Sequence, residues 1–293
     1  MALSAEEKEN LVKLLRRPRK TPVFPEDYAA CYPLVTREEY TVKTSEGESR
    51  AVVFRAKDQE PGSVMNVYIH GGGFVIGYTV RDDYYSAYIA AKTKGVVVAL
   101  DYKTAPEYPY PIAFNECYEL ALWALSKAAD WGADKGRASI GGFSAGANFS
   151  ASVLLKLGQT KAGKFSKVYL GYGPYDNVTP PGDKPGAAES DIPLDMAEGF
   201  NRAYFGGEDE KAKEIYASPI LASEEQLSVF PDTLLIVAQK CSFTAEGLDF
   251  ARKLAESGVK VTIRDFLGMP HAFIPQCKGD WKEADELIAS FIL

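Results

Sequence analysis

Short apolar runs recur along the chain at a spacing that predicts buried strands. The predicted strands are residues 64–69, 96–100, 138–141, 167–171, 233–238 and 259–266. Residues 96–100 have the continuous apolar character that is typical of a parallel strand covered on both faces. Residues 39–44 and 50–54 alternate polar and apolar positions around Ser45-Glu46-Gly47-Glu48, which predicts a hairpin.

Segments with helical spacing of apolar positions separate these runs. The predicted helices are residues 80–93, 111–129, 145–157, 244–257 and 281 to the end. Strand and helix alternate for most of the length, so the pattern predicts an α/β fold. Its central sheet is expected to be mostly parallel, with helices on both faces.

Two segments depart from this alternation. The first 38 or so residues are polar and contain one short amphipathic helix, which Ser4 and Glu7 are placed to cap and in which Leu11 and Leu15 are apolar. Residues 177–216 are rich in Pro, Gly and acidic residues and are predicted to be a lid or cap insertion rather than part of the sheet.

Composition narrows the class of protein. The 293 residues are 46% hydrophobic and 25% charged, as in globular proteins, and their net charge of −7 makes nucleic acid an unsuitable main partner. No apolar run approaches the ~18 residues of a membrane span. The N-terminus has no apolar signal core, so a cytoplasmic protein is expected. The four cysteines form no CxxC pair, which suits a reduced compartment and gives no zinc signature.

A G-x-S-x-G motif at Gly142–Gly146 lies between a predicted strand and a predicted helix. Glycines on both sides of the serine allow the sharp turn that holds a nucleophilic hydroxyl exposed. Ser144 is therefore the candidate nucleophile, and the N–H of Ala145 is a candidate oxyanion donor. The motif alone fits an ordinary glycine-rich turn equally well.

A second glycine-rich segment, His70-Gly71-Gly72-Gly73-Phe74, directly follows the strand at 64–69. Successive glycines let backbone N–H groups approach a developing negative charge, as in the oxyanion hole of esterases. Gly71 and Gly72 are the candidate donors. A phosphate-binding loop is the weaker alternative, because no Lys or Ser/Thr follows at the P-loop spacing.

The chain has only two histidines, so the candidates for an imidazole base are few. His271 follows the last predicted strand, at the edge where α/β sheets build their sites, and comes after the nucleophile in the chain. We expect His271 to be the general base and His70 to orient the glycine loop. The alternative for His271 is a structural role.

Together these motifs resemble those of the hormone-sensitive-lipase-like esterases, also called bacterial family IV. The shared residues are His70–Phe74, Asp101–Glu107, the segment around Ser144, Ser218-Pro219 and His271–Phe273. The resemblance implies a single α/β-hydrolase domain over 1–293, with a small helical cap formed by about 1–38 and 177–216. It also implies hydrolysis of short-chain esters without metal or cofactor, and structural roles for Asp101 and Glu107.

The chain departs from the family at the triad acid. Alignment on Leu234–Ala238 puts Cys241 where the family has aspartate. The acid normally fixes the histidine tautomer and stabilises the imidazolium. Asp176 is a candidate relocated acid, and Glu246 is a second one that is expected to face away.

Three alternatives involve no relocated acid. Cys241 itself is one candidate partner of His271, although a neutral thiol is a poor acceptor. A Ser–His dyad is another. The last is a site that only binds a small ligand, as in the plant gibberellin receptor, which resembles this family.

The function expected from the sequence is therefore a serine carboxylesterase that acts on acetyl-type esters through an acyl-enzyme. A catalytically weak protein that binds a small ligand is the alternative. The candidate pocket residues are Phe74, Phe143, Tyr84, Tyr85 and Phe200. The expected partner is a small ester, with no nucleic acid and no membrane. The sequence leaves open the choice between ester and amide and the oligomeric state, a homodimer included.

Overall fold

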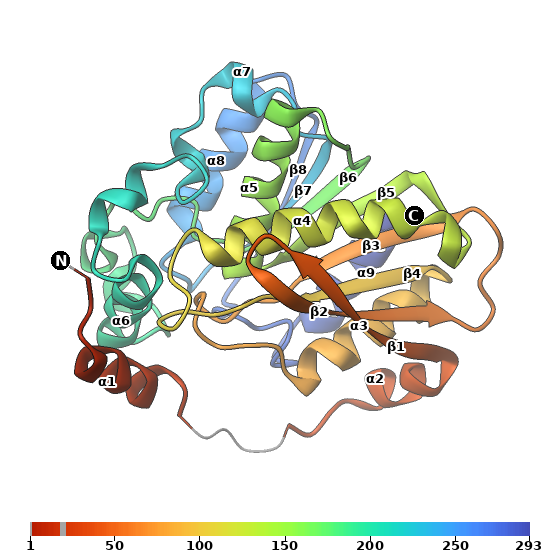
Figure 1. The fold of residues 1–293 in the computed structure, drawn as a ribbon, viewed down its shortest axis with the longest axis horizontal. Helices are drawn as coiled ribbons and strands as arrows, with labels where there is room; N and C mark the ends of the chain where they lie inside the picture. Colours follow the sequence, from red (N-terminus) through yellow and green to blue (C-terminus); the bar gives the residue numbers. More distant parts are fainter. Residues whose placement is uncertain (1, 18–21) are drawn as a thin grey trace.

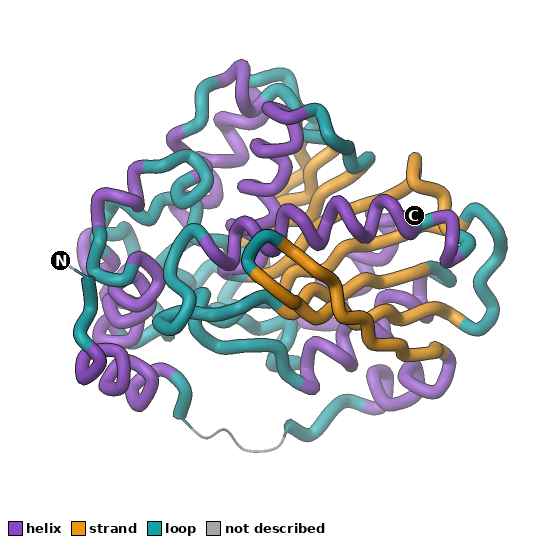
Figure 2. The backbone as a smooth tube through the Cα atoms, viewed as in Figure 1, coloured by secondary structure: helices purple, strands orange, loops and turns teal. Residues whose placement is uncertain are grey.

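The computed structural model describes residues 2–17 and 22–293 and has an eight-stranded sheet at its centre (Figures 1 and 2). The strands lie in the order β1-β2-β4-β3-β5-β6-β7-β8. Their bounds are β1 Val35–Thr44, β2 Gly47–Ala56, β3 Ser63–Ile69, β4 Val96–Asp101, β5 Ala133–Phe143, β6 Lys167–Gly171, β7 Asp232–Ala238 and β8 Val261–Phe266. Strands β1 and β2 are antiparallel to their neighbours, and all other pairs are parallel. The predicted α/β fold is confirmed.

Helices cover both faces of this sheet and enclose two apolar cores (Figure 1). The α-helices are α1 Ala5–Leu15, α2 Glu26–Cys31, α3 Val80–Thr93, α4 Ile112–Lys127, α5 Ala145–Thr160, α6 Leu194–Phe205, α7 Glu224–Leu227, α8 Thr244–Glu256 and α9 Trp281–Ile292. Helices α4, α5 and α8 pack on one face, and α2, α3 and α9 on the other. Within the described part of the chain, no helix combines the length and the apolar character needed to cross a membrane.

The N-terminal helix α1 packs against α6, the one α-helix of the 177–216 insertion, at the left of Figure 1. Ser4 caps α1 as predicted, with the N–H of Glu7 donating to its hydroxyl at 3.2 Å. Leu11 and Leu15 are buried in a small apolar cluster shared with α6. Helix α2 packs on α3 instead. Of the two N-terminal helices, α1 is therefore the one that meets the insertion.

Arg16, at the end of α1, ties this helix to loops of the main domain. Its Nε–H donates to the carbonyl oxygen of Val75 at 2.9 Å, and its guanidinium pairs with Glu107. Val75 lies two residues beyond the Gly71–Gly73 run. The contact therefore couples the position of α1 to the loop that follows β3.

Candidate active site

Ser144 lies at the turn where β5 ends and α5 begins, at the carboxyl edge of the sheet. Its backbone has φ 53° and ψ −122°, a strained conformation for a residue with a side chain. A Cβ atom on Gly142 or Gly146 would lie only 2.1 Å or 1.9 Å from the carbonyl oxygen of Ile69. Only glycine is tolerated at these two positions, so the sequence around Ser144 dictates the turn that presents its hydroxyl.

His271 reaches Ser144 from the loop after β8. Its Nε2 atom lies 2.9 Å from the Oγ atom of Ser144, within reach for direct proton transfer. Burial lowers the pKa of His271 from 6.5 to about 4, although the charge of Asp191 opposes this shift. The imidazole is therefore neutral at pH 7, which is the state that a general base requires.

Cys241 occupies the turn after β7 and contacts the other nitrogen of the same ring. Its Sγ atom lies 3.0 Å from Nδ1 of His271, and the N–H of Phe243 donates to the same sulfur at 3.4 Å. Burial raises the pKa of Cys241 to about 12, so the group at this position is a neutral thiol. The histidine thus has a hydrogen-bonding partner at Nδ1, but that partner carries no charge.

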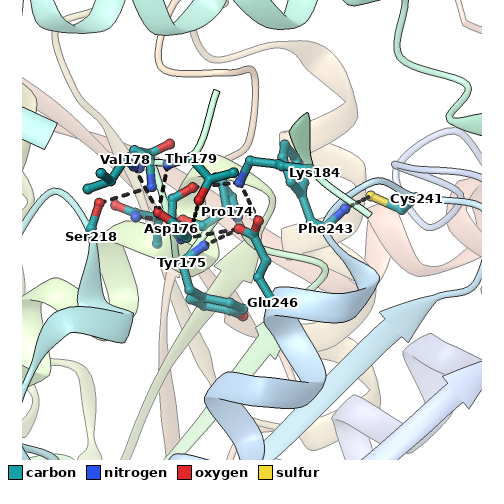
Figure 3. Close-up of polar contacts among 12 residues, drawn as sticks. Pro174, Tyr175, Asp176, Val178, Thr179, Lys184, Ser218, Cys241, Phe243 and Glu246 are labelled. Carbon is teal, nitrogen blue, oxygen red and sulfur yellow. Dashed lines mark hydrogen bonds and ion pairs between the residues drawn. The ribbon is translucent and has the colours of Figure 1, made fainter. Parts of the chain in front are cut away.

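Asp176 lies in the turn that follows β6, with its carboxylate directed into that turn (Figure 3). It accepts the N–H groups of Val178 at 2.8 Å and Thr179 at 3.1 Å, and the Thr179 hydroxyl at 2.6 Å. Although burial opposes the shift, these hydrogen bonds hold the pKa of Asp176 below its ordinary value. The structure does not bring this carboxylate to His271. The expectation that Asp176 is a relocated triad acid is therefore corrected, because the donors of its own turn hold its carboxylate there.

Glu246, the second candidate acid, is buried at the start of α8 and pairs with Lys184 of the insertion (Figure 3). It also accepts the N–H of Tyr175 at 2.7 Å. Burial raises the pKa of Glu246 to about 7, although Lys184 opposes this shift. Lys184 lies 5.1 Å from the centre of the Phe243 ring. The Glu246 carboxylate thus links the insertion to α8. It accepts from Lys184 and the N–H of Tyr175 rather than from His271.

The glycine run after β3 lies beside the serine, as the order of the motifs predicts. Gly71 and Gly72 line the same cavity as Ser144. Ala145 is the first residue of α5, so its N–H has no partner within the helix. His70 stacks on Tyr102 with ring centres 4.1 Å apart, and its Nδ1–H donates to the carbonyl oxygen of Gly71 at 2.7 Å. The geometry is that of a loop whose conformation His70 supports.

A cavity of about 300 Å³ opens over Ser144 and His271. Of the aromatic residues proposed from the sequence, Phe143 and Phe200 line it. The other three are placed elsewhere, which corrects those predictions. Their partners are core or surface rings: Phe74 stacks on Tyr204, Tyr84 stacks on Phe24, and the hydroxyl of Tyr85 donates to Tyr169.

Two charged residues of the insertion were missed by sequence analysis. Asp191 lines the cavity and accepts the backbone N–H of His271 at 2.9 Å, and Lys184 makes the buried pair with Glu246. Residues 177–193, which contain both, show no apolar periodicity from which such contacts could be inferred. Among residues 2–17 and 22–293, no group of three or more His, Cys, Asp or Glu side chains is arranged to hold a metal ion.

Comparison with known proteins places this geometry in a family. A family model described as α/β hydrolase fold matches residues 66–275. An arylesterase of Saccharolobus solfataricus is 25% identical over 78% of this chain and 78% of its own length. The carboxylesterase NlhH of Mycobacterium tuberculosis is 27% identical over 71% of this chain and 66% of its own length. The crystal structure of a hyperthermophilic esterase from Pyrobaculum calidifontis superimposes with a TM-score of 0.82 at 28% identity, covering 100% of this chain and 98% of that one. The chain belongs to the α/β-hydrolase family and, within it, to the hormone-sensitive-lipase-like esterases.

Proposed function

We propose that this protein is a serine carboxylesterase that hydrolyses short-chain acyl esters through an acyl-enzyme on Ser144. The observation that carries the proposal is the 2.9 Å contact between the Ser144 hydroxyl and Nε2 of His271, which line the same cavity as the glycine run. The esterase and carboxylesterase relatives support ester hydrolysis as the reaction class.

In this mechanism Ser144 Oγ attacks the ester carbonyl while Nε2 of His271 takes the hydroxyl proton. The N–H groups of Gly71, Gly72 and Ala145 bind the oxyanion of the tetrahedral intermediate. His271 then gives the proton to the leaving alcohol, and the acyl group remains on Ser144. A water molecule, deprotonated by His271, attacks the acyl carbonyl and releases the acid.

The thiol of Cys241 changes the first half of this cycle. Nε2 must be unprotonated to accept from Ser144, so Nδ1 must carry the proton and donate it to the sulfur. A carboxylate can only accept and therefore enforces this tautomer. A thiol can also donate, which leaves Nε2 protonated and unable to act as a base. The neutral thiol also gives little stabilisation to the imidazolium. We therefore expect turnover below that of a related enzyme with a complete triad.

The cavity supports a small substrate. Its volume of about 300 Å³ is at the lower end of the range for small-molecule sites. The rings of Phe143 and Phe200 contribute apolar surface, while Asp191 and Arg81 contribute charge. An acetyl-type acyl group and a modest alcohol fit such a space.

The experiment is hydrolysis of p-nitrophenyl acetate by the purified protein and by Ser144→Ala. We expect release of nitrophenol that depends on Ser144, and covalent labelling of Ser144 by a fluorophosphonate probe. The Asp176→Asn variant serves as a matched control, because that carboxylate lies outside the site. Absence of both labelling and turnover would refute the proposal.

A protein that binds a small ligand without turnover is the second candidate. The substitution of a neutral thiol at the acid position favours it, because this thiol stabilises the imidazolium weakly. Uptake of an ester or its product without turnover that depends on Ser144, measured by calorimetry, would support this candidate over the esterase.

A further inference from the structure

Asp191 brings a carboxylate to His271 from the insertion rather than from the sheet. Its Oδ1 atom accepts the backbone N–H of His271 at 2.9 Å, and its side chain lines the cavity. Asp82 is the other acidic residue of the cavity lining. Both oxygens of Asp82 are used by local donors, from the hydroxyl of Tyr68 at 2.9 Å and from Thr79 at 2.7 Å and 2.8 Å. The Asp191 carboxylate is thus the one that directly contacts the histidine loop.

The side chains that face the His271 ring carry no charge. Ser144 and Cys241 contact its two nitrogens, at 2.9 Å and 3.0 Å. The ring of Tyr172 meets it edge-on, with ring centres 5.1 Å apart. Burial raises the pKa of both Cys241 and Tyr172, so neither is ionised near neutral pH. The negative charge beside the imidazole therefore comes from Asp191.

Two cations lie beyond this layer. The ring of Phe243 lies 5.5 Å from that of His271, with Lys184 on it at 5.1 Å. Lys184 is itself paired with Glu246, which offsets its charge to the extent that this carboxylate is ionised. Arg81 lines the cavity and donates to the carbonyl oxygen of Pro275 at 2.8 Å. Asp191 is the negative charge that opposes these cations at the histidine loop.

We infer that Asp191 is a positioning residue that supplies, from the cap insertion, the negative charge that favours the imidazolium of His271 during catalysis. The inference deepens the proposed function and rests on it. Cys241 occupies the hydrogen-bonding position of the triad acid without its charge, and Asp191 provides charge without a bond to the ring. In a complete triad, one carboxylate both accepts the hydrogen bond from Nδ1 and supplies the negative charge. Here the first role falls to Cys241, in the turn after β7, and the second to Asp191, in the insertion.

The side chain of Asp191 is exposed, which sets the size of the effect. An interaction between unit charges a few ångströms apart near water is worth about a fivefold to tenfold change in rate, and added salt screens it. The contribution is therefore expected to be smaller than that of a buried triad carboxylate. It should also decrease as ionic strength rises.

The test is Asp191→Asn compared with Asp191→Ala and with Glu189→Gln. Asparagine keeps an oxygen that accepts the N–H of His271 but removes the charge, and alanine removes both. Glu189 is an exposed acid of the same loop that does not line the cavity, so Glu189→Gln controls for net charge. For D191N we expect kcat/KM on p-nitrophenyl acetate to fall about fivefold through kcat, with KM unchanged and a smaller loss at high salt.

A second readout is independent of turnover. The protein has two histidines, so the Cε1–H resonance of His271 is assigned by comparison with His271→Gln and titrated by NMR. Loss of the Asp191 charge should lower the pKa of His271 further, and Glu189→Gln should leave it unchanged. In a Cys241→Asp background, the effect of D191N on kcat should shrink, because a charged partner at Nδ1 already favours the imidazolium.

A structural role for Asp191 would give a different pattern. If D191N matches the wild type in rate and titration while D191A is slow, the carboxylate only holds the loop and the inference is overturned. If the wild type shows no turnover that depends on Ser144, the proposed function fails. The titration of His271 in D191N then still decides, by its shift or lack of shift, whether Asp191 acts on the ring through its charge.

Discussion

Replacing Cys241 by aspartate should speed the enzyme. Aspartate is close to cysteine in size, and its carboxylate would meet Nδ1 of His271 at about the position of the sulfur, 3.0 Å away. It would also accept the N–H of Phe243 that now donates to the sulfur. The variant would accept the Nδ1 proton without being able to donate one, so it would enforce the productive tautomer of His271.

The size of the gain follows from the geometry. At 3.0 Å and an effective dielectric constant of about 20, a carboxylate and an imidazolium attract by about 5.5 kcal/mol. The thiol already supplies a neutral hydrogen bond worth about 1 kcal/mol. Cys241 is 3% exposed, so desolvating a carboxylate there costs several kcal/mol, but this cost is present before and during the reaction and lowers stability rather than kcat. The difference of about 4.5 kcal/mol between the two interactions corresponds to a rise in kcat of up to about 1,000-fold.

The assay is the initial rate with p-nitrophenyl acetate, together with the melting temperature of each variant. Cys241→Asn provides a neutral control of similar size, and Cys241→Ala removes the contact to Nδ1. We expect the order Asp above wild type, and wild type above Ala. A folded Cys241→Asp variant no faster than Cys241→Asn would refute the reasoning, because the charge would then have no effect at this position.

Three further predictions concern the surroundings of the site. Asp176→Asn should leave kcat/KM within about twofold but lower stability by about 1 kcal/mol, measured by urea unfolding, and a collapse of activity would reinstate Asp176 as the acid. Because the pKa of His271 is held at about 4 by burial, kcat/KM should stay level down to about pH 5 and fall only as the base becomes protonated below that; a half-maximum near 6.5 in a pH–rate profile would contradict this. Arg16→Ala should cost about 1 to 3 kcal/mol in stability, because it leaves the Val75 carbonyl oxygen and Glu107 without this donor, and an unchanged melting temperature would count against the role of the contact.

Local patterns predicted much of the fold and singled out Ser144 and His271, which the structure places 2.9 Å apart. Short apolar runs placed the parallel strands because such strands are covered on both faces and need continuous apolar side chains. The alternation expected for the hairpin is less complete, because residues 51–54 of β2 are all buried. Ser144 and His271 were identifiable because glycines at 142 and 146 are required by close backbone contacts and because a histidine follows the last strand. These constraints act over a few residues.

Side-chain direction and partners distant in sequence were not predictable in this way. The carboxylate of Asp176 accepts from donors two and three residues away instead of from His271. An aromatic residue of a motif, such as Phe74, can pack in the core as well as line the pocket, and the sequence does not distinguish the two. Asp191 lies in a segment without periodicity, and its contact spans 80 positions of the chain. Such contacts depend on how the insertion packs against the loop after β8, which a local sequence pattern does not specify.

The contact made by Arg16 bears on how this enzyme can be re-engineered. One guanidinium links α1, which packs on the insertion, to the backbone beside the glycine run and to Glu107. The insertion is therefore not a module that can be exchanged on its own. A chimera that takes the insertion of a relative has to carry over the matching end of α1 together with residues 75 and 107. Otherwise the grafted insertion and the loop of the glycine run would lack their matching contacts.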